Sequence, residues 1–143
     1  MHTGSSSNPQ FQAFKPVYET GSSETCNSLQ WDSHRDNYLL ASLTGKSLKI
    51  FDIKVNMKAV SSVNTKYVYN FSAETAPNSS QYQACSYYEN TVALWDLRMF
   101  DKPVDLINET DSIIKTQWCP TKPGKLAVSF FFNRISSLIH SFK

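Results

Sequence analysis

The sequence predicts an all-β chain built from repeated units, because one motif recurs, aromatic residues are frequent and no segment keeps a helical period. Residues 91–97 alternate apolar and polar side chains and contain Trp95-Asp96, and residues 47–53 repeat that shape with the aspartate 44 positions earlier. A unit of about 40–45 residues that ends in Trp-Asp is typical of a β-propeller blade. Aromatic residues make up 13% of the chain, which favours strands, and the 3.6-residue apolar period of a helix is missing. We expect an incomplete WD-repeat propeller of about three blades that form an open sector.

The first unit is expected over residues 15–63, after a flexible leader at 1–14 that is rich in Ser, Gly, Asn and Gln. Its predicted strands are 26–31, 38–43 and 47–53. The turn before the last of these contains Gly45, which we expect to adopt the positive φ that tight turns often need.

The second and third units are expected over residues 64–108 and 109–129, followed by an aberrant C-terminal tail at 130–143 that lacks the aromatic-Asp ending. The predicted strands are 66–71, 82–88, 91–97 and 103–108 in the second unit, and 113–118 and 125–129 in the third. Trp31, Phe71 and Trp118 are interpreted as the same position in three successive units, 40 and 47 residues apart.

The recurring residues are expected to pack and not to react. Alternate residues of a strand point to opposite faces of its sheet, so Phe51 and Trp95 should fill the space between blades, where one large aromatic ring buries about 150–250 Å². Asp52 and Asp96 should accept hydrogen bonds from nearby backbone N–H groups in the turns that follow their strands.

Composition narrows the classes of protein and partner. The chain of 143 residues is 41% hydrophobic and 18% charged, as expected for a globular protein. Its net charge of +2 is scattered, which argues against a nucleic-acid partner. The first ten residues contain no apolar signal segment, and the apolar-rich stretch 126–132 is too short to cross a bilayer. We therefore expect a cytoplasmic, reduced protein without membrane insertion.

The three cysteines, Cys26, Cys85 and Cys119, contain no Cys-x-x-Cys pair and cannot all join disulfides. Each lies in or beside an apolar stretch, so we expect small buried side chains in place of metal ligands or nucleophiles.

Catalysis is not expected, and no catalytic, cofactor-binding or metal-binding residue is assigned. His2 and His140 fall in the leader and the tail, and His34 lies in a polar loop where a solvated turn residue is usual. The sequence contains no nucleophile elbow, phosphate loop, dinucleotide fingerprint or zinc-protease motif. An enzyme such as a hydrolase is the weaker alternative, and no cofactor is predicted.

Single-stranded RNA binding is a further alternative, because such sites interleave exposed aromatic residues with Lys or Arg. Tyr67 and Tyr69 beside Lys66 are the nearest approach to that pattern. One flanking lysine favours it only weakly.

Longer motifs resemble the Mios (missing oocyte) family of WD-repeat proteins, which are subunits of the GATOR complex. The resemblance runs in order from about residue 15 to about residue 129. Its more specific motifs are Cys26-Asn27-Ser28-Leu29-Gln30-Trp31, Trp95-Asp96-Leu97-Arg98, Phe100-Asp101-Lys102-Pro103-Val104 and Trp118-Cys119-Pro120-Thr121.

The resemblance implies a non-enzymatic scaffold that docks other GATOR subunits, and that acts in amino-acid signalling to the target-of-rapamycin kinase complex at the lysosome. A generic WD-repeat adaptor in another assembly is the alternative, because fold does not fix function. Family members are far longer and end in a zinc-binding domain. None of those zinc ligands matches a residue here. The sequence departs from the family pattern after Ser129, so a truncated fragment or isoform is expected.

Three uncapped blades should be marginally stable on their own. Repeat units bury their faces against neighbours, and closure of a propeller usually takes about 4–8 blades. We expect two exposed apolar flanks and an aggregation-prone segment at 126–132.

Overall fold

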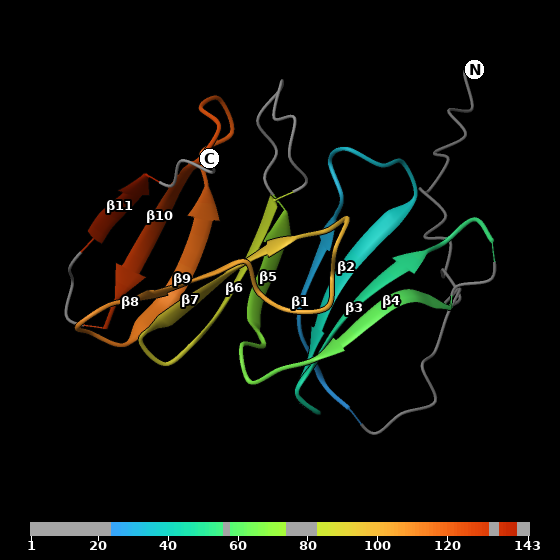
Figure 1. Ribbon diagram of the computed structural model, residues 1–143, viewed down its shortest axis with the longest axis horizontal. Helices are drawn as coiled ribbons and strands as arrows, with labels where there is room; N and C mark the ends of the chain where they lie inside the picture. The colour runs from blue at the N-terminus through green and yellow to red at the C-terminus, as the bar shows by residue number, and fades with distance from the viewer. Residues whose placement is uncertain (1–23, 56–57, 74–82, 132–134, 140–143) are drawn as a thin grey trace, which may run out of the picture.

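The computed structural model describes residues 24–55, 58–73, 83–131 and 135–139. Within these ranges it contains eleven strands in three antiparallel sheets and no helix (Figure 1). The all-β prediction is therefore confirmed, and each sheet corresponds to one blade of an open sector. The strands are β1 (Cys26–Trp31), β2 (Tyr38–Leu43), β3 (Ser47–Asp52), β4 (Ala59–Asn64), β5 (Tyr69–Ala73), β6 (Gln83–Tyr88), β7 (Thr91–Asp96), β8 (Asp105–Asn108), β9 (Ile113–Trp118), β10 (Lys125–Phe130) and β11 (Ile135–Ile139).

The first blade has the strand order β1-β2-β3-β4. Strand β2 is largely buried, as its nearly continuous run of hydrophobic residues, interrupted only by Ser42, indicates. Strand β4, Ala-Val-Ser-Ser-Val-Asn, was not predicted from the sequence. Its side chains are mostly small and mostly exposed, and only half of them are apolar. It becomes a strand because its backbone pairs with β3 along the outer edge of the blade.

The second blade, β5-β6-β7-β8, repeats the first with an offset of 44 residues in its outer half. Ser47 pairs with Asn64 in the first blade, and Thr91 pairs with Asn108 in the second. The backbone bonds that close these pairs follow the same offset. Thr65 N donates to Lys46 O at 2.8 Å, and Glu109 N donates to Asn90 O at 2.8 Å. The repeat suggested by the Trp-Asp motif is thus a repeat of backbone geometry.

The third blade has three described strands in the order β9-β10-β11. Strand β11 lies within residues 130–143, the range assigned to a tail, and pairs with β10. Its last residue, Ile139, faces Lys125. Asp52 faces Tyr38 and Asp96 faces Gln83 at the same place in the other blades. The third blade thus has an isoleucine where the others have the motif aspartate.

The turn between β2 and β3 corrects the expectation for Gly45. The residue with positive φ is Lys46, at 62°. The paired residues Leu43 and Ser47 enclose a three-residue loop, and such loops place a left-handed residue at their third position. A Cβ at position 45 would lie 1.6 Å from the carboxylate oxygen Oε1 of Glu24, so any larger residue there would require the Glu24 side chain to move.

Two apolar cores lie between the blades. β5 packs against β1 and β2, and β9 packs against β5 and β6, so the first strands of the three blades lie side by side. The first core includes Leu40 and Ile50 from blade 1 with Phe71 and Trp95 from blade 2. The second core includes Cys85 and Leu94 from blade 2 with Trp118, Leu126 and Val128 from blade 3.

Trp95 fills the space between blades 1 and 2 and is fully buried, as predicted. Phe51 occupies the equivalent register position, since Phe51 faces Leu39 and Trp95 faces Ala84. Phe51 is also buried, at 9% exposure. Its neighbour Ile50 belongs to the first core, so Phe51 points to the other face of blade 1, away from blade 2.

The proposed equivalence of Trp31, Phe71 and Trp118 was wrong for its middle member. Trp31 pairs with Leu39, and Ala73 pairs with Ala84, so Ala73 is the counterpart of Trp31. Phe71 lies two residues earlier, within the register shift between Tyr69 and Ser72. Such an irregularity adds a residue to one strand, which sequence spacing alone cannot reveal.

Candidate interaction surface

The motif aspartates hold turns, as predicted. Asp52 Oδ1 accepts a hydrogen bond from Lys54 N at 2.9 Å, and Asp96 Oδ1 accepts one from Arg98 N at 2.9 Å. The Arg98 guanidinium also donates to both carboxylate oxygens of Asp96, at 3.0 and 2.7 Å. These hydrogen bonds from Arg98 lower the pKa of Asp96 below its usual value. Asp96 is therefore part of a closed turn and is not poised for chemistry.

Sequence reasoning missed a third structural aspartate, Asp32, in the turn after β1. Its side chain is fully buried and forms an ion pair of 2.7 Å with Arg35 Nε, and its Oδ1 accepts a bond of 2.9 Å from His34 N. Arg35 in turn lies 4.3 Å from the ring centroid of Tyr38. His34 is thus a turn residue, in line with the expectation for it. An aspartate directly after the aromatic end of a predicted strand, followed by an arginine three positions later, was the available signal in the sequence.

The three cysteines differ in their exposure and in the pKa of their thiols, although the sequence predicted three buried side chains. Cys85 is fully buried, and burial raises the pKa of its thiol to about 11. Cys26 is exposed and Cys119 is half-buried, so the prediction of buried side chains was wrong for these two. Cys26 begins a strand and Cys119 follows one, and both positions lie outside the cores between the blades. A hydrogen bond from the backbone of Thr121 lowers the pKa of Cys119.

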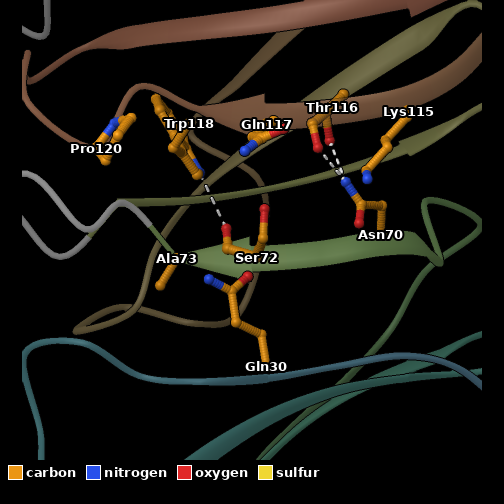
Figure 2. Close-up of a pocket in the computed structure, with 9 residues that line it drawn as sticks. All are labelled: Gln30, Asn70, Ser72, Ala73, Lys115, Thr116, Gln117, Trp118 and Pro120. Carbon is orange, nitrogen blue, oxygen red and sulfur yellow. Dashed lines mark hydrogen bonds between the residues drawn. The ribbon is translucent and has the colours of Figure 1, made fainter.

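A hollow of about 280 Å³ with a mixed lining lies along the first strands of the three blades (Figure 2). Asn70 Nδ2 donates to the backbone oxygen of Thr116 and to its Oγ1, the latter at 2.8 Å. Trp118 Nε1 donates to Ser72 O at 3.1 Å. The lining residues are Gln30, Asn70, Ser72, Ala73, Lys115, Thr116, Gln117, Trp118 and Pro120. The lining therefore combines amide and hydroxyl side chains with the apolar surface of Ala73, Trp118 and Pro120.

The flank of blade 1 that faces away from blade 2 is apolar and exposed. Leu29 and Trp31 on β1 are 63% and 58% exposed. The residues of β5 that face blade 1, Phe71 and Ala73, are completely buried, and Trp118 of β9 is 6% exposed. A first strand therefore carries apolar residues on the face that meets the preceding blade, and β1 presents that face to solvent.

The far flank of blade 3 has both polar and apolar exposed residues. Gln117 on β9 is an exposed polar residue, and Ala127 on β10 and Ile135 on β11 are exposed apolar residues. The expectation of a second apolar flank stays a prediction.

The residues considered for RNA binding do not form one stripe. The Lys66 ammonium lies 5.4 Å from the ring centroid of Tyr67. Tyr69 instead stacks on Tyr88, with ring centroids 6.1 Å apart. The described residues contain no group of three His, Cys, Asp or Glu side chains placed to hold a metal ion. None of the described segments is a helix long and apolar enough to span a membrane.

These repeated blades, with their aromatic wedges and turn aspartates, define a WD40-repeat protein. The family model described as MIOS, WD40 repeat, matches residues 3–142, and the chain belongs to this family. The match extends over both the segment expected as a leader and most of the segment expected as a tail. The family resemblance inferred from the motifs is confirmed.

Curated relatives agree with this assignment. The chain is 40% identical over 114 residues to the GATOR2 complex protein MIOS of Danio rerio, a match that covers 79% of this chain and 13% of the relative. It is 32% identical over 108 residues to the GATOR2 complex protein Mio of Drosophila melanogaster, covering 75% of this chain and 12% of the relative. The chain therefore spans only about an eighth of the length of these relatives.

Proposed function

We propose that this chain acts as a non-enzymatic interaction module that docks other protein subunits in a GATOR2-type assembly. The observation that carries the proposal is the identity of 40% over 114 residues with a protein named as a GATOR2 complex component. Its role is in amino-acid signalling to the target-of-rapamycin kinase complex, in the cytoplasm and at the lysosomal surface. This part of the proposal follows from the family alone.

The exposed flank of β1 supports a docking role. Trp31 and Leu29 form an apolar surface at the position where the other first strands bury theirs. Full burial of one large apolar side chain contributes about 1.5–3 kcal/mol, and tryptophan is enriched among the residues that dominate protein interfaces. We propose that this flank receives a surface of the same kind, the flank of a further blade.

Affinity purification tests the assignment. The full-length chain, tagged in its source cells, should co-purify with the GATOR2 subunits of that organism when the captured proteins are identified by mass spectrometry. Capture of a different stable assembly, with no GATOR2 subunit, would instead establish a generic WD-repeat adaptor and overturn the proposal.

A matched pair of variants tests the flank. Trp31→Glu should reduce the recovery of the assembly, because a carboxylate replaces an apolar docking residue. Met99→Glu is the control, since Met99 is 70% exposed in the turn after β7. Equal recovery of both variants would show that the β1 flank takes no part in docking.

A further inference from the structure

Three tyrosines gather where blades 2 and 3 meet, at the opposite end of β6 from its first residue. The Tyr69 ring stacks on Tyr88 with centroids 6.1 Å apart and planes 7° from parallel. The same ring meets Tyr87 at 5.7 Å with a tilt of 35°. A hollow of about 450 Å³ adjoins them and is completed by Glu89, Ile113 and Ile114. The hollow therefore draws on β5, β6 and β9, from both blades.

The floor of this hollow is fixed by bonds that join the two blades. The Tyr87 hydroxyl donates to the backbone oxygen of Ile114, and Ile113 N donates to Glu89 O at 2.8 Å. Tyr87 is 8% exposed, whereas Tyr69 and Ile114 are 43% and 52% exposed. The walls are thus held in place while part of their surface faces solvent, which reduces the ordering cost of binding.

One carboxylate stands at the rim. Glu89 is exposed and is the first residue of the two-residue turn between β6 and β7, with φ of 53°. Glycine is preferred at such a turn position, so the backbone conformation does not explain the presence of glutamate. A hydrogen bond between the Tyr88 hydroxyl and the Glu89 side chain raises the pKa of Tyr88. Glu89 lines the same hollow as the stacked rings and therefore lies beside them.

The rings of this cluster carry no cation from the described part of the chain, unlike two other tyrosines. Arg35 lies 4.3 Å from the ring centroid of Tyr38, and Lys66 lies 5.4 Å from that of Tyr67. Among the described residues, the ring of Tyr69 pairs with the rings of Tyr87 and Tyr88, and no cation lies over Tyr69 or Tyr88. An electron-rich ring face next to a carboxylate attracts a positive group.

We propose that this hollow, the tyrosine–glutamate site formed by Tyr69, Tyr88, Glu89 and Ile114, binds an arginine side chain of a partner protein. The planar guanidinium stacks on the exposed tyrosine ring and pairs with the Glu89 carboxylate, while its aliphatic stem lies on Ile114. Arginine fits better than lysine because it combines a flat face with two parallel donors for one carboxylate.

The site deepens the proposed docking function and rests on it for the identity of the partner. Both blades that build it are described, so its walls do not depend on what covers the β1 flank. Peptide binding at the tyrosine–glutamate site is measured without any partner subunit. A failed affinity purification and a failed peptide titration are therefore distinguishable.

Binding can be measured by NMR on the full-length chain with ¹³C-labelled tyrosine rings. The probe is the blocked peptide acetyl-Gly-Arg-Gly-amide, and the control peptide carries citrulline, which has the same shape without the charge. We expect saturable shifts of the Tyr69 and Tyr88 resonances with the arginine peptide, and at least tenfold weaker binding of the citrulline peptide. Equal binding of the two peptides, or no binding of either, would overturn the proposal.

Variants of the turn separate binding from folding. Glu89→Gln should weaken the arginine peptide at least tenfold. Glu89→Gly should do the same while keeping or raising the melting temperature, because glycine suits the left-handed turn position. Asp101→Asn removes an exposed carboxylate elsewhere in blade 2 and should leave binding unchanged. Retention of binding by the Glu89→Gly variant would show that the carboxylate has no role.

Discussion

Trp31 and Trp118 stand in the same local structure but in opposite environments. Each is the last residue of the first strand of its blade, and each precedes a turn closed by a backbone bond of 2.9 Å, from Asp32 N to Tyr38 O or from Cys119 N to Lys125 O. Trp31 is 58% exposed and Trp118 is 6% exposed. The burial of a blade residue is therefore decided by the neighbouring blade and not by its own strand or turn.

The two junctions between blades both combine apolar packing with directional hydrogen bonds. Between blades 1 and 2, Asn27 Nδ2 donates to Val68 O at 3.1 Å and Phe71 N donates to Ser28 Oγ at 2.8 Å. Between blades 2 and 3, Asn70 Nδ2 donates to Thr116 Oγ1 at 2.8 Å and Trp118 Nε1 donates to Ser72 O at 3.1 Å. At the second junction both donors are side chains, so single substitutions can remove these bonds.

The largest loss of folding stability is expected from removing the buried indole ring of Trp118. Trp118→Ala should lower the free energy of unfolding by about 3–5 kcal/mol, since it leaves a cavity against blade 2 and an unpaired Ser72 carbonyl. Trp31→Ala, the matched control, should change it by less than about 0.5 kcal/mol. Urea unfolding followed by circular dichroism measures both. Equal losses would mean that local structure, and not the neighbouring blade, sets the contribution of the ring.

An intermediate effect is expected from Asn70→Ala. The change removes both bonds to Thr116 across the second junction and should cost about 1–3 kcal/mol, because the Thr116 groups lose their partner. Thr116 itself is 2% exposed. The same urea titration applies, with Asn108→Ala as a control on the exposed outer edge. If Asn70→Ala is neutral, the polar bonds do not strengthen this junction.

A smaller loss of folding stability is expected from a change within one blade, at a contact that involves no neighbouring blade. Arg98→Ala should cost about 0.5–1 kcal/mol at neutral pH. The folded pKa of Asp96 is lowered by Arg98, so its contribution to stability is present above the unfolded pKa of about 3.9 and is lost as pH falls through the lower folded value.

Unfolding midpoints at pH 7 and pH 3 measure this dependence. The wild-type chain should lose more stability on acidification than the Arg98→Ala variant. Lys54→Ala is the matched control, because the corresponding turn at Asp52 uses only the backbone N–H of Lys54. A loss on acidification that is unchanged in Arg98→Ala would refute the link to this pair.

Chemical labelling of the cysteine thiols is expected to perturb the fold least, and its rate reports on the exposure and reactivity of each thiol. Iodoacetamide at neutral pH should modify Cys119 first, Cys26 next and Cys85 last. Hydrogen bonding lowers the pKa of Cys119, and burial raises that of Cys85 to about 11; the thiolate is the reactive form. Peptide mass spectrometry over time gives the order. Early modification of Cys85 would show that the junction between blades 2 and 3 opens readily.

The sequence predicted what depends on local periodicity. Strands β2, β3, β6 and β7 were correctly located because their alternation or continuous apolar runs are strong, and the roles of Asp52 and Asp96 followed from the chemistry of turns. The family could be inferred because several motifs recur in order.

What the sequence did not predict depends on pairing at a distance. Strand β4 has no hydrophobic pattern and exists because β3 offers an edge. The register shift in β5 displaced the assignment of Phe71, and the left-handed residue Lys46 follows from loop length. The stack of Tyr69 on Tyr88 joins residues from two strands. No local pattern signals such a contact.

The backbone bonds that recur with an offset of 44 residues make residues 47–90 an exchangeable cassette. In a tandem copy inserted after Asn90, the residue that copies Ser47 would take the place of Thr91. The first strand of the copy would therefore pair with β6 in the same way as β7 does. One duplication event could thus add a blade to such an array with the existing turns reused. Blade number in such a protein is thus open to change by simple genetic steps.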